Sequence, residues 1–383
     1  MYPRDLRRAA ACCAALGLAL LMLPVLAQAA SEPILRRLDD VKTVASTVPG
    51  ANGDLNPYGV VIIPRSSGRL VRGDILVSNF NNAASAANPG GEQGRGTTIV
   101  EISPRGQSHL FAQIDSAQLP GPCPGGVGLT TALTVLPGGW VVVGSLPTSD
   151  GTSATAQAGC LLILNNQGKV VKTLSGHGIN GPWDMTSISR NDDEATLFVT
   201  NVLNDTVNGG GSVVHEGTIL RIELRLGEDS APREVGRTTI ASGLSEKTDP
   251  AALVIGPTGV ALGQDSDKNV LYVADSADNR IAAIPNALER TTSAGRGKDV
   301  SIGGALNDPL GLAVADDGHI LTVNGNDGFI VETTREGQQV ATRLIDSTGT
   351  PPGAGTLFGL AKTDDSRGVY FVDDGSNTLN LLH

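Results

Sequence analysis

The chain alternates short apolar runs with polar turns, and the pattern is clearest over residues 256–285, GPTGVALGQDSDKNVLYVADSADNRIAAIP. Here the apolar runs 259–262, 270–275 and 280–284 are separated by the turns QDSDKN and SADN. Short apolar runs bounded by Gly, Asp and Asn are typical of β-strands. Because no long segment with helical periodicity follows the first 29 residues, the pattern predicts an all-β protein.

The same arrangement recurs six times, with first strands that begin near residues 57, 130, 182, 257, 309 and 357. The second strand of each repeat ends in a small polar residue, and a third strand follows; these end residues are Asn79, Ser145, Asn201, Asp275, Asn324 and Asp373. One such sheet cannot bury both of its faces, whereas repeats stacked around an axis can. We therefore expect a six-bladed β-propeller. An open β-solenoid is the alternative, and the long loops of the first three units would disturb its stacking.

Residues 1–29 have the features of a secretory signal peptide. Three arginines precede the apolar run 9–26, and the small-x-small sequence Ala27-Gln28-Ala29 follows it. We expect cleavage near the end of this sequence and a secreted or periplasmic protein, with an uncleaved membrane anchor as the alternative. No other stretch has about 18 consecutive apolar residues, so no further membrane span is expected.

Residues 30–383 are expected to form a single domain, because no linker or change of composition divides the repeats. The segment 39–47, DDVKTVAST, has the pattern of a lone strand, and the last unit ends after three strands. Pairing of 39–47 beside 377–382 would make it the outer strand of the last blade, and would close the ring without leaving an open edge. A loose N-terminal arm is the alternative.

The chain is acidic, with a formal net charge of −11 at pH 7. Nucleic acids and anionic membranes both require a positively charged face, so neither is expected as a partner. We expect a monomer whose partner is a protein or a small-molecule ligand.

Cys123 and Cys160 are the cysteines that follow residue 29. Cys123 precedes the first strand of the second unit, and Cys160 follows the long loop of the same unit. In an exported protein two such cysteines predict a disulfide, with two free thiols as the alternative.

The first three units carry long loops after their second strands, at 79–96, 146–159 and 202–217, whereas the last three units have short turns there. In a propeller these loops share one face, and long loops on a rigid scaffold often carry recognition. Loops without a function are the alternative. The candidate residues on this face are Tyr58, Asn79, Asn82, Trp183, Asp184, Asn201, His215, Asp275, Asn324, Phe358 and Asp373.

Oxygen-bearing side chains at the ends of the second strands suit a hard cation such as calcium. The candidate ligands are Asn79, Asn201, Asp275 and Asp373. The alternative is structural, because Asx side chains commonly cap turns by accepting hydrogen bonds from backbone N–H groups. Trp183, Tyr58 and Phe358 each begin a unit, where they line the mouth of the channel or pack between blades.

Two resemblances bear on the fold and the chemistry. The P-x-G sequences at 257–261 and 309–313, and VADSADNRI at 273–281, resemble the NHL-repeat family, which implies a six-bladed propeller. Asp184 stands where this pattern has Gly. The chain is also similar, more weakly, to gluconolactonase-type hydrolases, which hold a divalent ion with a Glu, two Asn and an Asp; here Tyr58 stands where that Glu is expected.

Other possible sites are weaker. Asp265-x-Asp267-x-Asn269 resembles the start of a calcium loop but lacks its later Gly and Glu, and is interpreted as a solvated turn. The five histidines have no paired ligand spacing and are interpreted as polar surface residues: His109, His177, His215, His319 and His383. The chain has no GxSxG, P-loop or CxxCH sequence.

These observations favour an exported propeller that acts as a binding or scaffold module through its loop-rich face, without a catalytic role. The alternative is a metal-assisted hydrolase or lactonase with an Asn/Asp site at the mouth of the channel.

Overall fold

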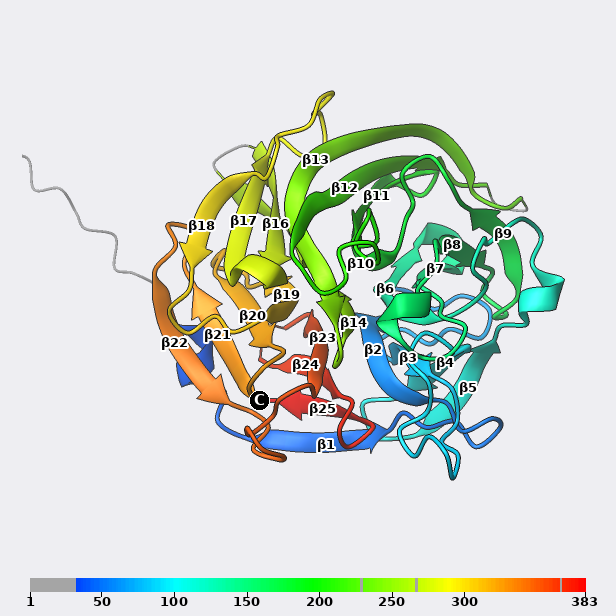
Figure 1. Ribbon diagram of the computed structural model, residues 1–383, viewed down its shortest axis with the longest axis horizontal. Coiled ribbons are helices and arrows are strands. Elements are labelled where there is room, and N and C mark those ends of the chain that lie inside the picture. Colours follow the sequence, from blue (N-terminus) through cyan, green and yellow to red (C-terminus); the bar gives the residue numbers. More distant parts are fainter. Residues whose placement is uncertain (1–31, 228–229, 266–267, 366) are drawn as a thin grey trace, which may run out of the picture. The chain divides into compact units, whose positions relative to one another are not determined.

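Six antiparallel sheets are arranged around a central axis in the computed structural model (Figure 1). The structure describes residues 32–227, 230–265, 268–365 and 367–383, and Pro33–His383 form one compact unit. The six-bladed all-β propeller expected from the repeats is confirmed. The proposed signal peptide lies outside the described residues.

The first three blades carry the long loops. Blade 1 consists of β2 (Leu55–Ile62), β3 (Ile75–Asn81), β4 (Thr98–Ile102) and β5 (Ser108–Gln113). Blade 2 consists of β6 (Leu129–Leu136), β7 (Trp140–Ser145), β8 (Cys160–Leu164) and β9 (Val170–Leu174). Blade 3 consists of β10 (Pro182–Asn191), β11 (Glu194–Asn201), β12 (Val214–Arg225), β13 (Arg233–Asp249) and the short β14 (Leu253–Ile255).

The last three blades are more regular. Blade 4 consists of β15 (Pro257–Asp265), β16 (Lys268–Asp275), β17 (Arg280–Pro285) and β18 (Lys298–Ile302). Blade 5 consists of β19 (Pro309–Val314), β20 (Ile320–Asn324), β21 (Phe329–Thr333) and β22 (Gln339–Leu344). Blade 6 consists of β23 (Leu357–Lys362), β24 (Val369–Asp373), β25 (Thr378–Leu382) and β1 (Val41–Ser46). The short 3₁₀ turns are η1 (Ile34–Arg36), η2 (Ser116–Gln118), η3 (Pro137–Gly139), η4 (Ser153–Thr155) and η5 (Ser276–Asp278).

In blade 6, the outermost strand comes from the other end of the chain. β1 pairs antiparallel with β25, from Val41 opposite Leu382 to Ser46 opposite Thr378. The segments 39–47 and 377–382, which were expected to lie side by side, therefore do so over these strands.

Glycines in the inner strands allow neighbouring blades to approach at the axis. A Cβ on Gly259 would overlap with the carbonyl oxygen of Leu310, and one on Gly311 would overlap with that of Phe358. These are the glycines of the two P-x-G sequences, so the motif is explained by close backbone approach. Blade 3 has Asp184 at the equivalent place, and its side chain is buried.

The outer strands β5, β9, β13, β18 and β22 were missing from the three-strand repeat expected from the sequence. Several of them are only partly buried: β9 reads VVKTL and β22 reads QVATRL, with intermediate or exposed positions through most of their length. Their polar and apolar residues therefore mix, and the apolar runs that marked the inner strands are absent from them.

The predicted disulfide is present between Cys123 and Cys160, which are 37 residues apart. It joins the segment before β6 to the start of β8, so it fixes the long loop of blade 2 to its own sheet. By loop-closure entropy a bridge of this span contributes about 3–4 kcal/mol. Within the described residues, no helix has the length and apolar character needed to cross a membrane.

Candidate functional site

The three long loops meet at one end of the axis, as expected, and two of them contact each other directly. Arg95 in the first loop donates from Nη1 to the carbonyl oxygen of Ser149 in the second, at 2.7 Å. The third loop is held by Glu246 of β13, whose Oε1 accepts from the backbone N–H of Asn204 at 2.8 Å. The loops are thus folded onto the propeller, which gives no support to the expected open recognition face.

A hairpin that the sequence reading missed covers the middle of this end. The end of β13 pairs with β14 over Lys247–Ile255, and we call residues 247–255 the axial hairpin. Figure 1 shows β14 close to the middle of the ring. Ser153 donates from Oγ to the carbonyl oxygen of Leu253 at 2.7 Å, and Gln93 donates from Nε2 to that of Pro250 at 2.8 Å. Two of the long loops therefore hold the axial hairpin in place.

The axial hairpin and four aromatic residues form an apolar core at the axis. Ala252, Leu253, Val254 and Ile255 pack in one buried cluster with the aromatic side chains of Tyr58, Phe80, Trp183 and Phe358. Leu253 has φ of 67°, a left-handed conformation that is rare for a residue with a Cβ. Its burial in the cluster compensates for that cost.

The aromatic residues pack against one another instead of lining an open mouth. The Tyr58 ring stacks on Phe358 and on Phe80, with centroid separations of 3.9 and 4.4 Å, and its centroid lies 5.7 Å from that of Trp183. Each of the four is at most 1% exposed. For Tyr58, Trp183 and Phe358 the structure therefore supports packing, the second of the two roles considered from the sequence.

The residues that end the second strands cap turns within their own blades. Asn201 accepts at Oδ1 from the backbone N–H of Asn180 at 2.8 Å, and Asn324 accepts from that of Asn307 at 3.1 Å. Asp373 accepts at Oδ1 from the backbone N–H of Ser376 at 3.0 Å. This is the turn-capping habit of Asx side chains.

The other two candidate cation ligands also have partners in the protein. Asn79 donates from Nδ2 to the carbonyl oxygen of Thr47 at 3.0 Å, and Asp275 forms an ion pair with Arg280 at 2.9 Å. Burial outweighs this ion pair and raises the pKa of Asp275 to about 6. A cation site made of Asn79, Asn201, Asp275 and Asp373 stays a prediction: each contacts the chain itself, while Asn79 Oδ1 and Asp275 Oδ1 are buried without a hydrogen-bond partner among the described residues.

Asn82 and His215 lie in the loop region but do not converge. Asn82 accepts at Oδ1 from the backbone N–H of Glu92 at 2.6 Å, inside the first loop. The Nδ1 atom of His215 lies 3.0 Å from Ser245 Oγ, which donates to Asp278 at 2.9 Å. The serine stands between the histidine and the acid, so this chain of hydrogen bonds lacks the order of a catalytic triad.

Some acids at the axis were not among the candidates predicted from the sequence. Asp308 precedes the first strand of blade 5 with φ of 57° and is 5% exposed. Its Oδ1 is buried and has no hydrogen-bond partner among the described residues. Burial raises the pKa of Asp308 to about 7; the nearby charge of Asp249 also raises it, and that of Lys247 lowers it.

A second buried acid, Asp374, follows the second strand of blade 6. Asn56, which has φ of 57° and precedes the first strand of blade 1, donates from Nδ2 to Asp374 Oδ2 at 2.8 Å. Burial raises the pKa of Asp374 well above its usual range. Burial together with the charges of Asp374 and Asp249 also raises the pKa of Tyr58.

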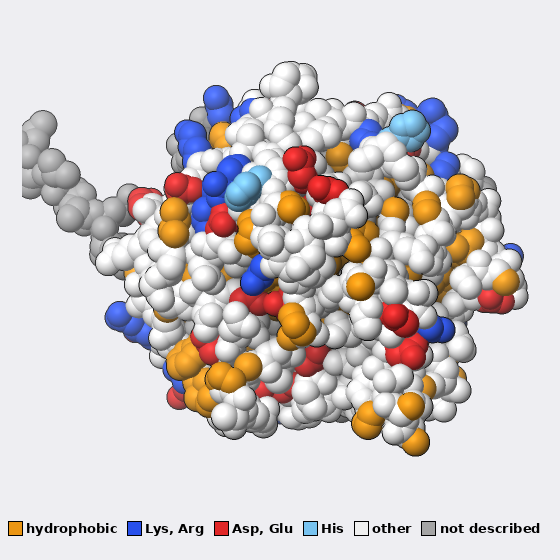
Figure 2. All heavy atoms as spheres, viewed as in Figure 1, with side chains coloured by type: hydrophobic (Ala, Val, Ile, Leu, Met, Phe, Trp, Pro, Cys, Tyr) orange, Lys and Arg blue, Asp and Glu red, His pale blue; other side chains and the backbone are white. Residues whose placement is uncertain are grey.

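We refer to Asp249, Asp308 and Asp374 as the axial acids. Figure 2 shows acidic side chains near the middle of this face. Asp308 and Asp374 were missed because each stands one residue away from a position that the repeat pattern marks, Asp308 before the Pro that opens β19 and Asp374 after the end of β24, whereas Asp249 lies in the hairpin that the pattern did not predict. Among the described residues they are not part of a group of three acids or histidines whose ligand atoms all lie within 4.8 Å of one another; Asp317, His319 and Glu332 form such a group.

The opposite end of the axis is open. A cavity of about 350 Å³ is lined by the inner strands of the blades, and Asp184 is among its lining residues. Asp184 accepts at Oδ2 from the backbone N–H of Val260 at 3.0 Å, and burial raises its pKa to about 7. Asp184 therefore does not share a site with the other candidates at the loop-bearing end.

The remaining candidates divide between surface and core. His109, His177, His215 and His383 are exposed, as expected. His319 is 9% exposed, and the expectation of a surface residue is wrong for it because it contacts the buried Glu332. In the proposed calcium-like turn, the side chains of Asp265 and Asp267 lie outside the described residues.

Comparisons with known proteins support the fold. No protein-family model and no curated protein matches the chain, so the NHL resemblance has no matching family model. A gluconolactonase from Xanthomonas campestris has a similar structure, with a TM-score of 0.52 and 12% identity over 92% of both chains. A luciferin-regenerating enzyme is similar with a TM-score of 0.50 and 12% identity, over 89% of this chain and 94% of its own. At this identity the similarity is one of fold.

Proposed function

We propose that the protein is a metal-assisted hydrolase of small esters or lactones, with a divalent cation held by the axial acids at the loop-bearing end. One of the structures similar in fold is described as a gluconolactonase, which makes this reaction class a natural starting point. Because one fold hosts many functions, the chemistry is argued from the residues of this chain.

The observation that carries the proposal is the buried carboxylate of Asp308. Its Oδ1 has no hydrogen-bond partner among the described residues, although the side chain is almost completely buried. An unpaired buried carboxylate is costly, and it is normally protonated, paired or bound to a cation. A pKa of about 7 means that a cation competes with a proton for this oxygen near neutral pH.

The donors around Asp308 suit a hard cation. Asp249 raises its pKa through space, so a second negative charge is near. Asp374, which accepts from Nδ2 of Asn56, lies at the same end of the axis, and the charges of Asp374 and Asp249 both act on Tyr58. Calcium binds such carboxylate and amide oxygens in flexible geometry and accepts waters as additional ligands, so it does not require a closed group of three acids.

Different acidic side chains would bind the cation and transfer the proton. A bound divalent cation polarises a carbonyl and lowers the pKa of a bound water. Asp308 and Asp249 hold negative charge at the site, while burial raises the pKa of Asp374 and so favours its role as the group that holds and returns a proton. Asn56 orients Asp374 through the hydrogen bond from its Nδ2.

Calcium binding tests the cation site. The purified chain is stripped with chelator and titrated with calcium by calorimetry. We expect binding that weakens at least tenfold in Asp308→Asn, because Asn tolerates φ of 57° but removes the charge. Asp184→Asn is the matched control, since Asp184 is equally buried with a similar pKa at the opposite end. Equal calcium affinity in the wild type and Asp308→Asn would contradict the cation site.

Hydrolysis tests the reaction class. We expect the calcium-loaded protein to open simple aldonolactones in a pH-stat assay, with loss of most activity in Asp308→Asn and none in Asp184→Asn. Calcium binding without hydrolysis of any lactone or aryl ester would leave the cation site in place but refute the hydrolase.

We also infer that the protein acts outside the cytoplasm, in the periplasm or the medium. The disulfide between Cys123 and Cys160 supports an oxidising compartment, and the sequence of residues 1–29 supports export. The P-x-G sequences of units four and five support a placement near NHL-repeat propellers as part of this proposal.

A further inference from the structure

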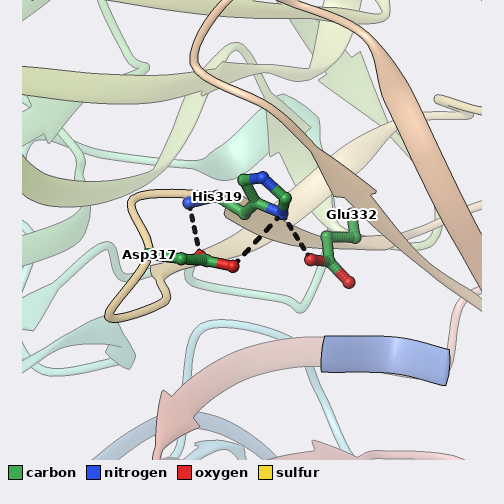
Figure 3. Close-up of side chains that lie close together, drawn as sticks. All are labelled: Asp317, His319 and Glu332. Carbon is green, nitrogen blue, oxygen red and sulfur yellow. Dashed lines mark hydrogen bonds and ion pairs between the residues drawn. The ribbon is translucent and has the colours of Figure 1, made fainter. Parts of the chain in front are cut away.

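A second group of possible metal ligands lies on blade 5, away from the residues assigned to the hydrolase. Asp317 lies in the turn between β19 and β20, His319 precedes β20, and Glu332 is in β21 (Figure 3). One ligand atom from each lies within 4.8 Å of the others. The Glu332 side chain is fully buried, and those of His319 and Asp317 are 11% and 24% exposed.

Two carboxylates face a single ring nitrogen in this group. His319 Nδ1 lies 2.6 Å from Glu332 Oε1 and 3.5 Å from Asp317 Oδ2. Dashed lines mark both contacts in Figure 3. One nitrogen carries at most one proton, which can be donated well to only one of the two acceptors. With the ring protonated or neutral the three side chains together stay anionic, so the arrangement favours a cation with more than one positive charge.

The remaining atoms of the two acids are held in place by backbone groups. Asp317 Oδ1 accepts from the backbone N–H of His319 at 2.9 Å, and its Oδ2 lies 3.5 Å from the ring nitrogen Nδ1. Glu332 accepts from the backbone N–H groups of Ile34 and Leu35, at 3.0 and 2.9 Å. Metal-binding carboxylates are commonly oriented by such outer hydrogen bonds, and each oxygen retains a further lone pair.

We propose that Asp317, His319 and Glu332 bind a first-row divalent cation, with zinc as the probe, which fastens the N-terminal segment 34–38 to blade 5. Imidazole and carboxylate are ligands that zinc accepts, and water completes the four-coordinate site. The separation of 2.6 Å between Nδ1 and Oε1 is that of a hydrogen bond, so the cation replaces the proton and the two atoms move apart to flank it.

The position of Glu332 gives the cation a structural role. Ile34, Leu35 and Leu38 are buried in a cluster with side chains of blades 5 and 6. Glu332 connects the start of η1 to β21, while Arg343 donates to the carbonyl oxygen of Leu35 at 3.1 Å. A cation on Glu332 would fix this carboxylate and so hold the segment that leads into β1.

Blade 1 offers a matched comparison. Glu101 occupies the same place in the third strand, after a Val, and its Oε1 accepts from the backbone N–H of Val71 at 2.9 Å. His109 Nε2 lies 3.5 Å from Glu101 Oε2, but this histidine side chain is 47% exposed. Among the described residues this pair does not belong to a group of three possible metal ligands, so His109→Asn is the control for His319→Asn.

Zinc titration of the chelator-stripped full chain tests the site. We expect the wild type to bind one more equivalent of zinc than His319→Asn, at least tenfold more tightly than any remaining site, and His109→Asn to match the wild type. Asp317→Asn, in a surface turn, should weaken zinc binding at least tenfold and keeps the test valid if His319→Asn fails to fold. Zinc that binds the folded Asp317→Asn as well as the wild type would be adventitious and would overturn the proposal.

Hydrogen exchange at Ile34 and Leu35 gives a second readout. Their amides donate to Glu332, so zinc should slow their exchange at least tenfold in the wild type and leave it unchanged in Asp317→Asn. Zinc binding without slower exchange at these two amides would overturn the fastening role.

Discussion

The two halves of the loop-bearing end fill the same repeat position with opposite kinds of residue. At the position that follows Asn79, Ser145 and Asn201, blades 1–3 have Phe80, Leu146 and Val202, all fully buried in the apolar cluster at the axis. Blades 4–6 have Ser276, Gly325 and Asp374 at this position. The long loops belong to the apolar half and the short turns to the polar half. One repeated backbone thus carries a packed side and a side with buried acids.

The comparison separates what the repeats need for folding from what they leave free. Turn caps recur in both halves, with Asn201 in blade 3 and Asn324 in blade 5 accepting from backbone N–H groups in the same way. The residues beside the caps differ from blade to blade, and Asp308 and Asp374 are among them. Function is therefore better sought next to the repeated positions than at them.

Removal of a large side chain from the apolar half should have the largest effect on stability. Trp183 is 1% exposed and packs against Tyr58 and Phe80, so Trp183→Ala should lower the free energy of unfolding by about 3–5 kcal/mol. Urea unfolding followed by circular dichroism measures this. Phe329→Ala, at a ring that is 36% exposed in blade 5, is the control and should cost under about 1 kcal/mol. Equal losses in the two variants would contradict the packed half.

Loss of the disulfide tests how far the long loops depend on covalent support. Replacing both Cys123 and Cys160 by Ala should lower the free energy of unfolding by about 3–4 kcal/mol, because the unfolded chain regains the entropy of a 37-residue loop. The same unfolding experiment measures it. Reduction of the wild type should reproduce the loss, and a reductant-insensitive stability would show that the bridge does not support this half.

Sequence patterns predicted the strands that are buried on both faces. The inner strands and the P-x-G glycines were predictable, because neighbouring backbones meet at Gly259 and Gly311 and leave no room for a side chain. The outer strands were missed, since half-exposed strands such as β22 mix polar and apolar residues. The apolar run AALVI of the axial hairpin resembles one more strand in sequence, and only tertiary contacts place it on the axis.

In the candidate site, the repeat pattern locates the acids only to within one residue. Side chains alternate along a strand, so a repeat pattern that identifies the last strand residue does not say whether it or the next one faces the axis. Asp373 caps its turn by accepting from the backbone N–H of Ser376, whereas the charge of Asp374 raises the pKa of Tyr58 at the axis. The left-handed conformation that places Asp308 there has no signal in the sequence beyond the following Pro.

The pH dependence of stability sharpens the contrast between the halves. Burial raises the pKa of Asp308 to about 7, so the folded protein holds this proton more tightly than the unfolded chain. Its contribution is full below about pH 4, is lost as the pH rises to about 7, and stays lost above that. Asp308→Asn should therefore be more stable than the wild type at pH 8, by on the order of 2 kcal/mol, and similar to it at pH 4.

Asp184 provides the control for this measurement, because burial raises its pKa to about 7 as well. Asp184→Asn should show the same pH dependence at the opposite end of the axis. At pH 8, saturating calcium should reduce the stability advantage of Asp308→Asn over the wild type, because the cation stabilises the ionised wild-type carboxylate. It should not change the advantage of Asp184→Asn. If calcium leaves the stability advantage of both variants over the wild type unchanged, the result would count against a cation at Asp308.

The smallest expected effect concerns a contact inside the half that carries the long loops, where Ser153 of the blade 2 loop binds the axial hairpin of blade 3. Its Oγ lies 2.7 Å from the carbonyl oxygen of Leu253 and 3.3 Å from that of Asp249, so Ser153→Ala should cost about 1 kcal/mol. Hydrogen exchange should show faster opening of residues 247–255, with Ser108→Ala in the exposed start of β5 as the control. Because the hairpin carries Asp249, the same variant should bind calcium less tightly. An unchanged exchange rate in residues 247–255 would mean that apolar packing around Leu253, and not the loop, holds the axial hairpin in place.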